Sequence, residues 1–198
     1  MTEAAETEPT GPPALVVELW YAEPPDLSDP RLLAALRAVA PAAQPQQDSI
    51  SVPHEALTIA RDGHPVPLLT VVMAASPLGA AGKTLPDTTQ TWDWAEADEA
   101  VARCRGSLLV TEMFAAGFAP QQRVTALGEV VAALVRHTHP SVLSWPQSQR
   151  VSDPAGFEVG SAADVINVRF FSVGDSGDEM IMDTLGLHVF ELPDVQCH

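Results

Sequence analysis

Three side chains that commonly bind metal ions lie close together in the last residues of this sequence. His188, Cys197 and His198 occur within "HVFELPDVQCH", with Asp183 and Asp194 nearby. Imidazole nitrogen and thiolate sulfur are preferred ligands of Zn²⁺. Cys197 and His198 would point to opposite faces of a strand, however, because successive side chains alternate. A structural strand-turn-strand with no cofactor is therefore the favoured prediction, and a metal site built from the two histidines and Cys197 is the alternative.

Asp183 and His188 raise a second chemistry, which is general-base catalysis. An aspartate can orient an imidazole so that it takes a proton from a substrate, provided that the two side chains approach within hydrogen-bond reach. Glu112 or Cys197 would be further members of such a site. This pair predicts, as the alternative function, a small-molecule hydrolase or a metal-dependent enzyme.

The same stretch also has the features of a turn that is stabilised by its own polar side chains. Asp183 and Thr184 precede Leu185-Gly186, and short polar side chains at such positions often bond nearby backbone amides. We therefore predict Asp183, Thr184, His188 and Asp194 as binding residues.

The elements that must position these residues follow from apolar periodicity. Strands are predicted at residues 14–21, 49–75 with a turn at Asp62-Gly63, 107–114, 141–145 and 163–173, and helices at residues 30–40, 94–104 and 120–139. Asp93 and Glu96 have the spacing of a capping box for the second helix. The order predicts an α+β fold, a largely antiparallel sheet with two or three amphipathic helices packed on it.

Charge excludes several classes of partner. The 198 residues include 26 acidic and 10 basic side chains, a net charge of −16, and such a field repels nucleic acid. Residues 151–198 carry nine acids and one base, Arg169, which would suit a basic partner. The longest aliphatic run, residues 68–75, is too short to cross a membrane.

Cysteine content and the first residues indicate where the protein works. Two cysteines and an N-terminal stretch unlike a signal peptide predict a reducing, cytoplasmic setting. Residues 1–13, rich in glutamate and without a basic side chain, are predicted to be a disordered acidic leader. Residues 14–198 are predicted to form a single α+β domain.

Three segments resemble one bacterial family. "TWDWAEADEAVARCRGSLLVTEM", "SVLSWPQSQRV" and "MDTLGLHVFELPDVQCH" are similar to the family known as domain of unknown function 4261, whose signature is Asp-Thr-Leu-Gly-Leu-His followed by Leu-Pro-Asp. The resemblance runs from about residue 65 to 198 and implies no catalytic residues. It also implies a chain truncated at its C-terminus, which would leave residues 195–198 as an exposed edge open to self-association.

The function favoured by these observations is a non-catalytic, cytoplasmic protein-interaction or regulatory module. Its contact would be a protein partner or a second copy, made through an exposed sheet edge or through the acidic C-terminal region. If the acidic region is used, binding should weaken as salt is raised.

Overall fold

A computed structural model describes residues 13–173 and 179–197 of the chain. The predicted acidic leader lies outside the described residues except for Pro13. The turn predicted between the last two long strands, residues 174–178, and His198 also lie outside them.

The centre of the molecule is a seven-stranded antiparallel sheet with the order β2-β3-β4-β5-β1-β6-β7. Its strands are β1 (Val16–Tyr21), β2 (Gln44–Pro45), β3 (Ser49–Arg61), β4 (His64–Ala74), β5 (Gly106–Met113), β6 (Val142–Trp145) and β7 (Arg150–Ser152). Every adjacent pair runs antiparallel. With the helices packed against it, this sheet confirms the predicted α+β class.

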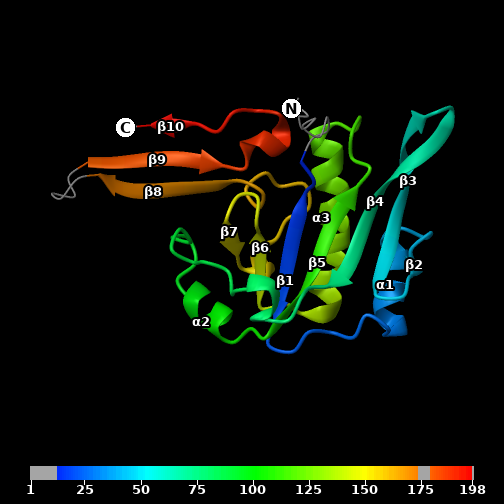
Figure 1. Ribbon diagram of the computed structural model, residues 1–198, viewed down its shortest axis with the longest axis horizontal. Coiled ribbons are helices and arrows are strands. Elements are labelled where there is room, and N and C mark those ends of the chain that lie inside the picture. The colour runs from blue at the N-terminus through cyan, green and yellow to red at the C-terminus, as the bar shows by residue number, and fades with distance from the viewer. Residues whose placement is uncertain (1–12, 174–178, 198) are drawn as a thin grey trace, which may run out of the picture.

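Two helices cover one face of this main sheet, and a short third helix covers part of the other face. On one face lie α1 (Pro30–Val39) and α3 (Pro120–Thr138), which pack on alternate residues of β1 such as Val17 and Leu19 (Figure 1). On the other, α2 (Ala97–Ala102) packs against Trp20. Single 3₁₀ turns occur at η1 (Ala80–Gly82), η2 (Pro154–Gly156) and η3 (Leu187–Phe190). In the described part of the chain, every helix falls short of the length and apolar character needed to cross a membrane.

The helix starts agree with the sequence in one case and not in another. The Asp29 carboxylate accepts a hydrogen bond from the Arg31 amide at the start of α1, as an N-cap residue does. The capping box predicted at Asp93 and Glu96 is wrong. Helix α2 begins only at Ala97. The Asp93 carboxylate accepts a 2.7 Å hydrogen bond from Arg150 Nη2, so it forms a tertiary ion pair instead of capping the helix.

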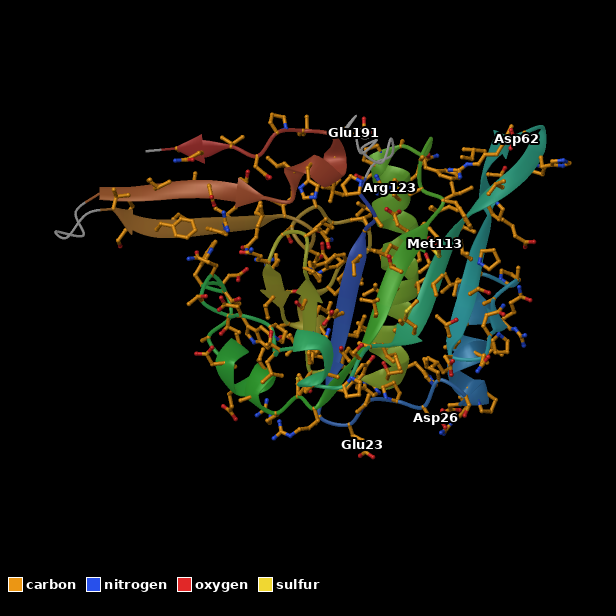
Figure 2. All side chains as sticks on the ribbon, in the orientation of Figure 1. Glu23, Asp26, Asp62, Met113, Arg123 and Glu191 are labelled. Carbon is orange, nitrogen blue, oxygen red and sulfur yellow. The ribbon has the colours of Figure 1, made fainter. Side chains whose placement is uncertain are left out.

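The β3-β4 hairpin turns where the sequence predicts. Asp62 and Gly63 have φ values of 49° and 78°, the sign that a two-residue hairpin turn of type I′ requires, and Asp62 lies at the hairpin tip in Figure 2. The β3-β4 register shifts between His54 and Thr58. Residues 55–57 therefore form an irregular segment in β3.

A second, smaller sheet extends beyond the main sheet (Figure 1). It contains β8 (Asn167–Val173), β9 (Glu179–Leu185) and the two-residue β10 (Gln196–Cys197), in the order β10-β9-β8, and we call it the arm. Gly186 joins it to the body. Its φ is 109°, and a Cβ added there would lie 2.6 Å from the carbonyl oxygen of Val165, so only glycine fits this joint.

Candidate functional site

Asp183 is already engaged within the arm. It lies opposite Arg169 in the β8-β9 register, and the guanidinium donates to both of its carboxylate oxygens, Nε at 2.9 Å and Nη2 at 2.6 Å. The pairing with Asp183 raises the pKa of Arg169 further above its usual value. The carboxylate therefore holds two strands together, which is a structural role.

Near the C-terminal end of β9, Thr184 lies close to Asp194, and Asp194 lies close to His188. The Thr184 hydroxyl accepts a hydrogen bond from the Val195 amide at 2.9 Å, and Asp194 Oδ1 accepts one from the Leu187 amide at 3.0 Å. His188 Nδ1 lies 4.0 Å from Asp194 Oδ2. These contacts fix the turn at η3. The turn predicted at Asp183 and Thr184 is wrong, because both residues lie within strand β9. Asp183 pairs with Arg169 across the sheet, and Thr184 bonds the distant Val195 amide.

The remaining predicted residues lie apart from one another. Cys197 is exposed on β10, opposite Met182, and His198 is outside the described residues. Within the part of the chain that the structure describes, no three His, Cys, Asp or Glu side chains gather in a way that could hold a metal ion. Glu112 is on β5, where it pairs with Arg123 of α3.

The Glu112 and Arg123 pair is buried in the body of the protein. Their side chains are 1% and 0% exposed. Glu112 Oε1 also accepts a hydrogen bond from the Leu15 amide, and Arg123 Nη2 donates to the Pro13 carbonyl oxygen. These bonds fasten the start of β1 to β5 and α3, so Glu112 acts in folding rather than beside Asp183 and His188.

An exposed apolar surface on the arm is the feature that the sequence reading missed. In the β8-β9 register Phe170 lies opposite Met182, and Met180 lies opposite Ser172, so the three apolar side chains share one face because their positions have the same parity. Trp92 contacts Phe170 edge to face, with ring centroids 5.6 Å apart. These four residues, Trp92, Phe170, Met180 and Met182, are 37–62% exposed, and we call them the methionine-aromatic face.

The loop before α2 holds the arm in place. Trp92 Nε1 donates to the Val168 carbonyl at 2.9 Å. The Gln90 side-chain amide both donates to the Phe170 carbonyl oxygen and accepts from the Phe170 amide, at 3.2 and 3.0 Å. One side chain thus makes the two bonds that a neighbouring strand would make with β8.

Lys83 ties this loop to the main sheet. Its ammonium pairs with the carboxylate of Glu18 on β1 and lies 4.8 Å from the ring centroid of Trp20. Together they line a cavity of about 450 Å³ between the loop and the sheet. Because Glu18 neutralises the only lysine of the chain, Lys83 serves to anchor the loop.

The chain segments next to the methionine-aromatic face are rich in acidic residues. Residues 84–99, the loop and the start of α2, contain five carboxylates and no lysine or arginine. Asp93 and Glu99 are ion-paired with Arg150 and Arg103, which leaves three carboxylates of this segment without a salt bridge to another described residue. Beyond the arm strands, Glu191 and Asp194 are exposed, whereas Arg169, the only base in residues 151–198, is occupied by Asp183. The methionine-aromatic face is therefore an apolar surface next to segments with an excess of negative charge.

Comparisons of the chain with protein-family models, with curated proteins and with solved structures found no match. Membership of the family known as domain of unknown function 4261 therefore stays a prediction. The candidate site depends on the geometry of the arm alone.

Proposed function

We propose that this protein is a non-catalytic interaction module that binds a basic, partly apolar segment of another protein on the methionine-aromatic face. The observation that supports the proposal is the exposure of Trp92, Phe170, Met180 and Met182 together on one face of a projecting sheet. No element among the described residues covers these apolar side chains, and clustered apolar side chains that stay exposed commonly mark a site of association.

The composition of the face suits recognition of a protein segment. Methionine side chains are flexible and polarisable, so they adapt to the shape of a partner. Tryptophan and phenylalanine contribute large contact areas, and Trp is among the residues enriched at binding hot spots. The loop before α2 restrains Trp92 and Phe170, because Trp92 and Gln90 make hydrogen bonds to the backbone of β8. Restrained side chains lose less entropy when a partner binds.

The negative charge near the methionine-aromatic face favours a different protein, rather than a second copy of this chain, as the binding partner. The carboxylates around the face would repel the same region of another copy but attract lysine and arginine side chains. A net charge of −16 makes self-association less favourable still. The proposed occupant is therefore a segment with basic and apolar residues, in a cytoplasmic partner.

A hydrolase that uses Asp183 and His188 receives less support from the geometry. Arg169 occupies both oxygens of Asp183, and the carboxylate near His188 is that of Asp194. A general base needs an imidazole oriented by a carboxylate within hydrogen-bond distance. The 4.0 Å contact exceeds that distance.

The test is photo-crosslinking in cells of the source organism. A benzophenone amino acid replaces Met182 on the methionine-aromatic face or, as a matched control, exposed Glu23 at the far end of the main sheet from Arg123 (Figure 2). We expect position 182 to crosslink one protein, and the crosslinked peptide to contain lysine or arginine beside apolar residues. Raising salt from about 50 to 500 mM should lower the yield, because ions screen the attraction.

Three results would overturn the proposal. These are equal crosslinking from positions 182 and 23, crosslinks from 182 only to a second copy, and a crosslinked peptide that is acidic. If the crosslinking yield at position 182 did not change with salt, the proposal that the partner is basic would be wrong, and an apolar contact would remain.

A further inference from the structure

A cavity of about 560 Å³ lies between α1, β3 and α3, away from the arm. Its apolar wall includes Val39 and Ala40 at the end of α1, Leu57 on β3 and Ala126 on α3. The irregular segment of β3, residues 55–57, forms one side of it. The volume is within the range of pockets that hold small molecules, and bulged strands often border binding sites.

His54 contributes a polar group to this apolar cavity. The residue is 8% exposed, and a 2.9 Å hydrogen bond joins its Nε2 to the hydroxyl of Thr70 on β4. Among the described residues, Nδ1 has no hydrogen-bond partner. Burial lowers the pKa of His54, which keeps the ring neutral near pH 7, so it adds no positive charge to the cavity.

Two carboxylates at the cavity are without a counter-ion. Glu55 and Glu129 are exposed and line it from β3 and α3, and neither makes an ion pair with another described residue. Arg136 lines an adjacent hollow with Glu129, but no lysine or arginine lines this cavity. The C-terminal end of α1, which carries the negative end of a helix dipole, also borders it.

We propose that this cavity binds a small organic ammonium ion with an apolar body, such as an arylalkylamine. The ammonium group lies between Glu55 and Glu129, and the apolar body packs against Leu57, Val39 and Ala126. A carboxylate ligand of the same shape is repelled by the two glutamates. A neutral alcohol keeps the apolar contacts and loses the charge attraction.

The experiment titrates the ¹⁵N-labelled full chain with 2-phenylethylamine near pH 7 and follows amide chemical shifts. The comparators, 2-phenylethanol and 3-phenylpropionate, have similar shape and differ in charge. We expect saturable shifts confined to residues 54–57 and 121–129 with the amine, weaker ones with the alcohol, and none with the carboxylate. Shifts in the arm are not expected, so the outcome is separate from that of the partner proposal.

The double variant Glu55→Gln, Glu129→Gln isolates the charge. Because exposed ion pairs are weak individually, we expect the amine to bind about three- to tenfold more weakly, with the alcohol unchanged. Glu23→Gln removes an exposed carboxylate that does not line the cavity and should have no effect. A dispersed spectrum shows that each variant is folded. Equal binding of amine and carboxylate, unchanged affinity in the double variant, or no saturable shift would overturn the proposal.

Discussion

The main sheet and the arm are both antiparallel sheets with apolar strands, yet they have opposite exposures. Leu19 and Trp20 on β1 are buried on opposite faces, beneath α3 and α2 respectively, whereas Phe170 and Phe171 on β8 are exposed on both faces of the arm. The strands themselves do not differ in kind. What differs is whether a helix packs on them, so the same sequence pattern gives a core in one region and a surface in the other.

The two regions also contain comparable ion pairs in different surroundings. Glu112 and Arg123 have almost no exposure, whereas the side chains of Arg169 and Asp183 are 19% and 22% exposed. Water can solvate the second pair if one member is lost. Water cannot readily reach Glu112 and Arg123 if one of them is lost. The cost of breaking each pair therefore reports how far water is excluded from the body and from the arm.

The largest effect is expected from Glu112→Gln in the body. The change removes the charge that compensates buried Arg123, and breaking a buried pair in this way costs about 3–5 kcal/mol. Urea unfolding followed by tryptophan fluorescence measures the loss. Replacing both partners, Glu112→Met with Arg123→Met, should recover only part of it, because the Leu15 amide and the Pro13 carbonyl oxygen lose their side-chain partners. A loss below about 1 kcal/mol would show that this pair is solvated like that of the arm.

An intermediate effect is expected from Gly186→Ala at the joint. The new Cβ would collide with the Val165 carbonyl and with Ser148, at a cost of about 1–3 kcal/mol. Hydrogen exchange should show the loss of protection concentrated in β8 and β9. Gly63→Ala is the control, because Gly63 also has a positive φ but has open space around it. Equal losses in the two variants would mean that backbone strain alone, rather than the collision, matters at Gly186.

The smallest effect is expected from Asp183→Asn in the arm. Partly exposed ion pairs contribute about 0.2–1 kcal/mol, so we expect faster amide exchange in β8 and β9 with an unchanged urea midpoint. Glu99→Gln breaks the exposed pair with Arg103 on α2 and should leave arm exchange unaltered. A shift of the urea midpoint as large as that of Glu112→Gln would remove the distinction between body and arm.

The long elements of the fold could be predicted because each is determined by its own residues. Apolar spacing places α3, and the Asp62-Gly63 dipeptide places the β3-β4 turn. Asp29 and Pro30 place the start of α1. The start of helix α2 could not be predicted in this way. Asp93 binds Arg150, which is 57 residues away in sequence, and the spacing of neighbouring residues gives no information about such a contact.

The candidate site was harder to predict for a related reason. The sequence draws attention to Asp183, but the role of that residue depends on Arg169, which only the β8-β9 register places opposite it. Phe170, Met180 and Met182 have the alternation of an ordinary half-buried strand. Whether another element covers them is a property of the whole fold.

Gln90 affects how readily the arm, which carries the methionine-aromatic face, could pair edge to edge with another strand. A projecting sheet with free strand edges is a template for edge-to-edge polymerisation. By bonding both backbone groups of Phe170, Gln90 closes the outer edge of β8 at its midpoint, and Trp92 closes it at Val168. The opposite edge, β10, is only two residues long. Along the β8 edge, the arm can therefore offer apolar side chains to a partner while leaving few free backbone groups at Val168 and Phe170 for another strand to pair with.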